Sequence, residues 1–239
     1  MFSSIITIIV VIALIILSVV FLKQFFKVIA GLWSVLFIVL IVLSVLLYFD
    51  VKDLQANFDK GEKVVLLKEN GNILTGFRLL ENQKTTFYKD ISDADNAFKA
   101  KNYASLKGNA YKLLIAQKDL FSDVDFITVI GYPLDRATLF SYLNDDAPKE
   151  KAAEFISKEN AVPKNLVTKE IEKEFSTEDQ FKGYLFAKLM GRTLEKKGAN
   201  FIIQEYKKGT IEVYPETIAF KMIDYLPQSL FDKLFGEKA

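Results

Sequence analysis

The sequence has no cysteine and no histidine among its 239 residues. The lack of cysteine excludes disulfide bonds and thiol nucleophiles, and the lack of both residues excludes zinc sites built from them. Histidine is the side chain best matched to proton transfer near neutral pH, so its absence also excludes Ser-His-Asp and Cys-His catalysis. Any catalysis would have to use carboxylates, lysine, tyrosine, serine, threonine or a bound cofactor.

Charge is nearly missing from the first 49 residues, which contain no Asp, Glu or Arg and only two lysines, Lys23 and Lys27. Residues 50–239 carry all 30 acidic residues and 29 of the 31 basic ones. This near-neutral balance gives no general attraction to nucleic acid, whose binding proteins carry a basic surface. We therefore expect no nucleic-acid partner.

Two long apolar runs, Ile5 to Leu22 and Val28 to Phe49, fill this N-terminal part. As helices rising about 1.5 Å per residue they would span roughly 27 and 33 Å, close to the ~30 Å hydrocarbon core of a membrane. They predict a two-helix transmembrane hairpin in residues 1–49, with helices at about 5–22 and 28–49 and the lipid bilayer as a partner. The alternative for the first run is a signal peptide, but it lacks a basic segment before it and a small-x-small cleavage site.

The lysines near the two runs give conflicting indications of orientation. Lys23 and Lys27 in the short connection place it in the cytoplasm and both chain ends outside, by the positive-inside rule. Counting every lysine after the second run indicates the reverse, because four follow it closely: Lys52, Lys60, Lys63 and Lys68. Long domains obey the rule poorly, so we favour an extracytoplasmic domain.

The remainder predicts an α+β fold. Residues 50–61 should continue the second helix as a linker, because Val51, Leu54 and Phe58 recur at helical spacing. Residues 62–239 should form one α+β soluble domain with two β-hairpins and several helices. The first hairpin is expected over residues 62–80 around Asn70-Gly71, a pair that suits a turn with two positive φ angles.

Apolar periodicity and turn residues predict the other elements of the domain. The pattern mixes strands with clustered helices, which favours α+β over a regularly alternating α/β fold. In chain order we first expect a strand at Thr85 to Tyr88, a helix from Ser92, a strand or helix at Ala110 to Gln117, and a buried strand at Phe126 to Ile130. Four helices should follow: one at Leu134 to Leu143, one capped by Asp146, one at Val167 to Phe175, and a long one at Thr177 to Lys197 capped by Ser176. The chain should end with a second hairpin, with strands Asn200 to Tyr206 and Thr210 to Tyr214, and with two helices opened by Pro215 and Pro227.

Three acidic motifs are candidate sites, each with a structural alternative. Asp123-Val124-Asp125 has the Asp-x-Asp spacing of phosphotransferases, but that chemistry needs a strand before the first Asp, and here the expected strand follows it. Asp93-Ala94-Asp95-Asn96 has part of a calcium-loop pattern without its Gly and Glu, and a helix N-terminus explains the same acids. Asn144-Asp145-Asp146 fits a loop and helix cap, with a weak surface Ca²⁺ or Mg²⁺ contact as the alternative.

Two further patterns concern nucleophiles and aromatic residues. A serine–lysine pair would be the natural nucleophile system without histidine, but no serine lies in a recognisable nucleophile turn. The C-terminal part is aromatic-rich, which indicates a contact surface or, as the favoured alternative, a helix packed on a hairpin. A third alternative is a final helix lying on the membrane. These aromatic residues are Tyr206, Tyr214, Phe220, Tyr225, Phe231 and Phe235.

The sequence therefore assigns no catalytic, cofactor-binding or metal-ligating residue. The leading hypothesis is a non-enzymatic membrane-anchored protein whose domain binds another protein or itself, as an envelope scaffold or accessory subunit. The rival hypothesis is a membrane-bound hydrolase that uses Ser/Lys or paired carboxylates. A deep pocket holding a lysine or carboxylate with a strongly shifted pKa would favour the hydrolase, and exposed apolar surface would favour binding.

Overall fold

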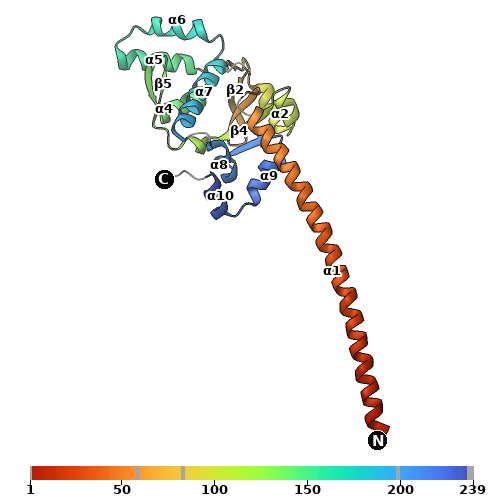
Figure 1. The fold of residues 1–239 in the computed structure, drawn as a ribbon. Helices are drawn as coiled ribbons and strands as arrows, with labels where there is room; N and C mark the ends of the chain where they lie inside the picture. The colour runs from red at the N-terminus through yellow and green to blue at the C-terminus, as the bar shows by residue number, and fades with distance from the viewer. Residues whose placement is uncertain (1, 58–59, 82–83, 198–199, 236–239) are drawn as a thin grey trace. The chain divides into compact units, whose positions relative to one another are not determined.

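The computed structural model describes residues 2–57, 60–81, 84–197 and 200–235 (Figure 1). The chain divides into two compact units, Met1–Val51 and Lys52–Ala239. The second unit is α+β, with a five-stranded sheet, a separate two-stranded sheet and surrounding helices.

The N-terminal helix α1 runs from Phe2 to Asn57 without a break, and its part up to Val51 belongs to the first unit. The predicted transmembrane hairpin, with helices at 5–22 and 28–49, is therefore wrong, because residues 23–27 are helical. Their sequence, KQFFK, contains no Gly, Pro, Asn or Asp that would end a helix, so the backbone hydrogen-bonding pattern continues. Within the described chain, one helical segment, Phe21–Asp50, is both long enough and apolar enough to cross a membrane, with a mean hydropathy of 2.9.

The larger sheet of the second unit is mixed, with the strand order β3-β2-β1-β4-β7. Strands β1 and β4 are parallel, and the other neighbouring pairs are antiparallel. The strands are β1 (Lys63–Glu69), β2 (Asn72–Leu79), β3 (Thr85–Phe87), β4 (Lys112–Gln117) and β7 (Ile211–Tyr214). The smaller sheet is a hairpin of β5 (Phe126–Val129) and β6 (Tyr132–Asp135).

Helices cover both faces of the larger sheet, with α7 on one side and α2 on the other (Figure 1). The 3₁₀ helix η1 (Lys118–Phe121) follows β4 directly. The α-helices are α2 (Ser92–Lys99), α3 (Tyr103–Lys107), α4 (Arg136–Leu143), α5 (Pro148–Asn160), α6 (Lys164–Glu174), α7 (Glu178–Lys197), α8 (Phe201–Lys208), α9 (Ile218–Tyr225) and α10 (Gln228–Phe235).

Alternation along the strands divides the core into two clusters. Val65 and Leu67 of β1 belong to the larger cluster beneath α7, while Val64 and Leu66 belong to the smaller one beneath α2 and α3. Successive side chains of a strand point to opposite faces, so continuous apolar strands such as KVVLLKE need cover on both sides. This requirement explains why the sheet lies between two layers of helix.

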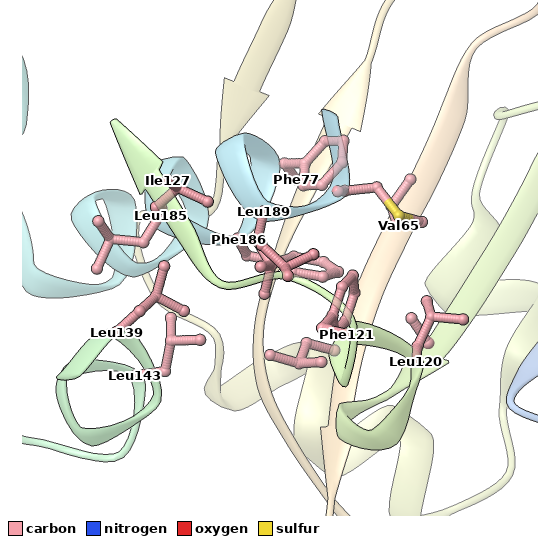
Figure 2. Close-up of a cluster of buried hydrophobic side chains, with 14 of the residues drawn as sticks. Val65, Phe77, Leu120, Phe121, Ile127, Leu139, Leu143, Leu185, Phe186 and Leu189 are labelled. Carbon is pink, nitrogen blue, oxygen red and sulfur yellow. The ribbon is translucent and has the colours of Figure 1, made fainter. Parts of the chain in front are cut away.

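Figure 2 shows how α7 closes the larger cluster. Phe186 and Leu189 point from α7 toward Phe77 of β2 and Phe121 of η1 (Figure 2). The ring centroids of Phe77 and Phe186 are 5.3 Å apart, and those of Phe121 and Phe186 are 5.9 Å apart. Buried aromatic pairs at such distances stabilise beyond their apolar area.

Several predicted elements are confirmed. The first hairpin has its turn at Asn70 and Gly71, whose φ angles are 50° and 80°. A strand forms at Thr85–Phe87, a helix begins at Ser92, and the ambiguous segment before residue 117 is strand β4. The long helix α7 ends at Lys197 as expected, and α10 follows Pro227 directly.

The second predicted hairpin is wrong in its first half. Residues 201–208 form helix α8, and Thr210 to Tyr214 contributes strand β7, which pairs with β4 instead. The buried residues of α8 recur at helical spacing, as Phe201, Ile202, Glu205 and Tyr206. Gly209, with φ 77°, ends the helix in the left-handed conformation that glycine adopts easily.

Other boundaries differ in smaller ways. The helix predicted from Leu134 begins at Arg136, because Tyr132–Asp135 forms edge strand β6, where the missing N–H of Pro133 is tolerated. The strand predicted as buried, β5, alternates exposed and buried residues, and Phe126 is 49% exposed. Helix α9 begins at Ile218 rather than at Pro215.

Two predicted helix caps are also corrected. At α7 the hydroxyl of Thr177, not Ser176, accepts the backbone N–H of Gln180 at 3.2 Å. At α5 the N-cap residue is Ala147 rather than Asp146, and Pro148 occupies the first turn as expected. The backbone N–H of Lys149 in that turn donates to the carboxylate of Glu178 in α7 at 3.0 Å. Asp145, the neighbour of the predicted cap Asp146, instead accepts the backbone N–H of Ala147 at 3.0 Å.

Candidate functional site: a groove along strand β7

A groove of about 700 Å³ runs along β7, the last strand of the larger sheet. Its lining comes from β7 itself, from Tyr206, Lys207 and Lys208 of α8, and from Lys221 and Asp224 of α9. Segments from distant parts of the sequence therefore enclose one edge of the sheet. Sheet edges are places where an additional chain can bind through its backbone.

The register of β7 determines which of its backbone groups face this groove. The N–H of Gln117 donates to the carbonyl of Thr210 at 2.9 Å, so these opposed residues form a hydrogen-bonded pair. Bonded and non-bonded pairs alternate in an antiparallel ladder. Glu212 and Tyr214 therefore bond toward β4, whereas Ile211 and Val213 direct their N–H and C=O groups away from it.

The outward side of β7 is covered rather than open to solvent. Ile211 and Val213 are among the residues that line the groove, yet they are only 1% and 6% exposed, and their side chains belong to the larger core cluster. The accessible surface of the groove therefore comes from the residues around these two.

Tyr206 lies beside two carboxylates at one wall of the groove. Its hydroxyl donates to Oε1 of Glu216 at 2.9 Å and lies 3.2 Å from Oδ2 of Asp224. Burial first, and then the hydrogen bond with Glu216, raise the pKa of Tyr206 above its ordinary value of 10.0. The phenol therefore keeps its proton at neutral pH and acts as a donor that holds α8 against the segment before α9.

Lys207 fixes the other end of the same wall. Its ammonium donates to the carbonyls of Ile223, Asp224 and Leu226 at 2.9, 2.7 and 3.0 Å. These carbonyls lie at the C-terminal end of α9, where the last turn leaves acceptors unpaired and the helix dipole favours a cation. Lys207 of α8 thus acts as the C-terminal cap of α9.

The buried Lys112 supports the groove from inside the domain. Its side chain is fully buried at the start of β4, and its ammonium donates to the carbonyl of Pro215 at 2.9 Å. The ammonium also lies 5.6 Å from the ring centroid of Phe220 in α9. A buried lysine without a recognisable sequence motif therefore anchors the segment that joins β7 to α9.

Charged and aromatic side chains line the face of the groove near α3. Glu212 forms an ion pair with Lys68 of β1, across the intervening strand β4. The rings of Tyr214 and Tyr103 lie with centroids 5.7 Å apart. Lys208 pairs at 2.8 Å with Glu205, a carboxylate that is 4% exposed. The groove is thus amphipathic rather than uniformly charged.

The Asp-x-Asp motif lies away from this groove. Asp123 pairs with Lys197 at 2.8 Å, and its pKa is lowered by the hydrogen bond and the charge of that lysine. The backbone carbonyl of Asp125 accepts the N–H of Arg136 at 3.0 Å. Both residues stand in the loop before β5, so the strand that a phosphotransferase nucleophile needs does not precede them.

The two other acidic motifs have structural contacts. Asp95 accepts the backbone N–H of Ile73 at 2.8 Å and pairs with Lys99 at 2.5 Å, which holds α2 to β2. Asp145 pairs with Lys151, and Asn144 donates to Glu69 at 2.9 Å. Within the described chain no group of three or more acidic side chains is placed to hold a metal ion.

The structure bears differently on the serine–lysine alternative and on the C-terminal aromatic residues. No serine is among the described residues that line the groove, so no serine–lysine pair is brought together there. The aromatic residues separate by burial: Phe220 and Phe231 are in the core, whereas Tyr225 is 87% exposed. Tyr214 lines the groove. The side chain of Phe235 lies outside the described residues.

Sequence reasoning missed the groove for a structural reason. The residues that line it come from distant parts of the chain, since Tyr103 of α3 and Lys221 of α9 are 118 residues apart. The aromatic bias near Tyr206 and Tyr214 was the available signal, and it marked the correct region without indicating a sheet edge. The assignment of residues 200–206 as a strand concealed that β7 has β4 as its partner on one side and the groove on the other.

The fold and the groove define a class: an α+β domain with a groove along the end strand of its larger sheet, preceded in the chain by a helix long and apolar enough to cross a membrane. No known protein family, curated protein or solved structure matches the chain. The groove and helix α1 are therefore the two features from which a function can be inferred.

Proposed function

We propose that this chain is a membrane-anchored protein whose α+β domain binds another protein in the β7 groove, as an envelope scaffold or an accessory subunit. The observation that carries this proposal is the amphipathic groove along β7, whose lining includes Tyr103, Tyr206 and Tyr214. Aromatic side chains are typical of surfaces that bind polypeptides.

Exposed apolar side chains beside the groove support a protein partner. Helix α9, which contributes Lys221 and Asp224 to the groove, also carries Met222 and Tyr225, which are 39% and 87% exposed. Apolar surface that adjoins a polar groove is a common feature of protein-binding sites.

Helix α1 supports the anchoring part of the proposal. Its segment Phe21–Asp50 exceeds the ~20 residues that a helix needs to cross the hydrocarbon core. Leu32, Trp33 and Phe37 are each about two-thirds exposed, unlike the buried side chains of a core helix in a globular protein. The orientation predicted from Lys23 and Lys27 depended on a connection between two helices, which the continuous helix removes. We therefore propose an anchor without assigning a side of the membrane.

The rival hydrolase has one candidate pair of carboxylates in the groove, Glu216 and Asp224. Both lie within hydrogen-bonding distance of the Tyr206 hydroxyl, which acts as a structural donor between them. Because both carboxylates serve to hold this hydroxyl in place, the geometry favours binding over hydrolysis.

Site-specific photo-crosslinking tests the proposal. The photoreactive residue p-benzoylphenylalanine would replace Lys221, which is exposed at the groove, or Glu172, which is exposed on α6. The full chain would be expressed in its native membranes, illuminated and purified, and the crosslinked peptide mapped by mass spectrometry. We expect one protein crosslinked from position 221 and not from position 172, and its recovery at a constant ratio with the full chain.

Other results of these experiments would contradict the binding proposal. Identical crosslinks from both positions, or none from position 221, would contradict binding in the groove. A purified full chain that hydrolyses peptide, ester or glycoside test substrates, and loses that activity on Glu216→Gln, would replace the binding proposal with the hydrolase.

A further inference from the structure

We infer that the cleft between β5 and α7 is a second binding site, which takes an extended acidic segment of a partner protein as a third strand beside β5. The cleft has a volume of about 420 Å³, and none of its lining residues also lines the β7 groove. The inference therefore goes beyond the proposed function and does not depend on it. A strand edge binds an extended segment through main-chain hydrogen bonds, while neighbouring side chains select its sequence.

The two walls of the cleft come from different elements. Phe126, Ile127 and Thr128 of β5 form one wall, and α7 supplies the other. Helix α7 contacts β5, whereas α4 contacts β6, the other strand of the hairpin. The residues that α7 contributes are all at least partly exposed, and they are Ala187, Lys188, Gly191, Arg192 and Glu195.

The register of the β5–β6 hairpin directs backbone groups of β5 away from β6. The N–H of Arg136 donates to the carbonyl of Asp125 at 3.0 Å, so these opposed residues form a hydrogen-bonded pair. Bonded and non-bonded pairs alternate, which places Phe126 and Thr128 in non-bonded pairs with their N–H and C=O groups on the outer edge. Pro133 opposes Thr128 and agrees with this register, because its missing N–H would point outward from β6.

The outer edge of β5 is exposed, unlike that of β7. Phe126 is 49% exposed, Thr128 is exposed as well, and both line the cleft. Among the residues that the structure describes, no other group bonds to their outward N–H and C=O groups. The corresponding residues of β7, Ile211 and Val213, are buried. An exposed strand edge with unpaired backbone groups is a place where another chain can add.

The α7 wall determines the charge of the segment. Lys188 and Arg192 contribute two positive charges, against one negative charge from Glu195. Arg192 approaches Glu195 at 3.5 Å between two exposed side chains, and the ammonium of Lys188 lies 5.5 Å from the ring centroid of Tyr184. Exposed ion pairs contribute little, so both cations can pair with an acidic group instead. A segment with Asp or Glu toward α7 therefore complements this wall.

Phe126 adds an apolar contact at the same edge. Its ring centroid lies 5.8 Å from the guanidinium carbon of Arg192, so the two side chains lie together beside the cleft. Aromatic and β-branched residues make favourable cross-strand pairs with an aromatic residue. We therefore expect such a residue beside Phe126, acidic residues toward α7, and no proline where the segment bonds to β5.

Peptide selection followed by a blocking variant tests the inference. A phage-displayed library of random twelve-residue peptides would be selected on the full chain in lipid nanodiscs. A Cβ at Gly191 meets no atom within 4 Å, so Gly191→Trp places a large side chain in the cleft without displacing the core. Leu194→Trp is the matched control, because Leu194 is exposed on the same helix and does not line the cleft.

We expect selected peptides that are rich in Asp and Glu. They should lose at least tenfold in affinity for Gly191→Trp and for Lys188→Glu, and keep their affinity for Leu194→Trp. When each peptide amide is N-methylated in turn, strong loss should occur at every second position only. The N-methylation scan uses the unmodified protein, so it decides the question even if a variant does not fold.

Four results would overturn the inference. They are equal affinity of every selected peptide for Gly191→Trp and Leu194→Trp, N-methylation effects without alternation, selected peptides without acidic residues, and failure to select any peptide. The last result counts because a site that binds through the backbone accepts many sequences. The crosslink from position 221 reports on the β7 groove alone, so the proposed function stands or fails separately.

Discussion

Gly183 of α7 lies directly against the carbonyl oxygen of Gly76 in β2, and a Cβ atom at Gly183 would stand 2.8 Å from that oxygen. The same Cβ would stand 3.1 Å from the Cβ of Phe87. The long helix can approach the sheet this closely because neither backbone carries a side chain at the crossing. Gly183→Ala should therefore destabilise the domain by about 1–3 kcal/mol, the usual cost of overpacking a core. Thermal melting of the full chain in detergent, followed by circular dichroism, measures the loss.

Gly191→Ala in the same helix is the matched control. A Cβ at Gly191 would meet no atom within 4 Å, so the substitution only removes a flexible residue from a helix. It should stabilise the domain by up to about 1 kcal/mol, in line with the helix propensities of the two residues. Equal effects at positions 183 and 191 would contradict the close packing of α7 on β2.

This packing illustrates which parts of the fold can be predicted from sequence. The turn at Asn70 and Gly71 could be predicted because two adjacent residues carry the whole signal. The approach of Gly183 to Gly76 could not, since it depends on how a helix and a strand separated by a hundred residues meet. The same reason hid the groove, because the pairing of β7 with β4 leaves no local pattern in either strand.

The hydrogen bonds of Lys207 predict a role in the stability of α9. Lys207→Met keeps the aliphatic stem and removes the ammonium that caps three carbonyls at the end of α9. Hydrogen bonds from a charged donor contribute about 1.5–3 kcal/mol, so a loss of that order is expected. Amide hydrogen exchange should become faster in residues 218–226, measured by mass spectrometry on the full chain.

Lys221→Met is the comparison variant for this prediction. Lys221 lies exposed on α9 itself, and substitutions of this kind usually change stability by less than about 0.5 kcal/mol. Unchanged exchange in α9 for Lys207→Met, or equal acceleration in both variants, would show that Lys207 does not cap the helix.

The contacts of Glu69, the last residue of β1, predict that the stability of the domain depends on pH. Burial opposes its charged form, but the hydrogen bonds from Lys118 at 2.5 Å and Asn144 at 2.9 Å outweigh it and lower the pKa of Glu69 below 4.5. A carboxyl group with a lowered folded-state pKa stabilises the protein above its unfolded pKa, and this contribution is lost as the pH falls toward the folded value. The unmodified chain should therefore exceed Glu69→Gln in stability at pH 7, by a margin that narrows below about pH 4.5.

Melting temperatures between pH 7 and pH 3 measure this margin. Glu172→Gln removes the same charge from the exposed side of α6 and should give no comparable difference at pH 7. A margin for Glu69→Gln that stays constant down to pH 3 would mean that the contacts of Glu69 do not depend on its charge.

The continuous course of α1 gives the clearest test of the corrected N-terminal structure. The two apolar runs are compatible both with one continuous helix and with two helices joined by a turn. Only the conformation of residues 23–27 distinguishes these alternatives, and in the structure these residues are helical. Because the chain has no cysteine, Val11→Cys and Leu40→Cys can be combined and spin-labelled without removing native thiols. In one continuous helix the two backbones are 29 residues apart, or about 44 Å at 1.5 Å per residue. In a hairpin that turns at residues 23–27 they would lie side by side, at about the 8–10 Å of packed helices. Pulsed electron paramagnetic resonance in nanodiscs should therefore give a single long distance, and a short one would restore the two-helix hairpin.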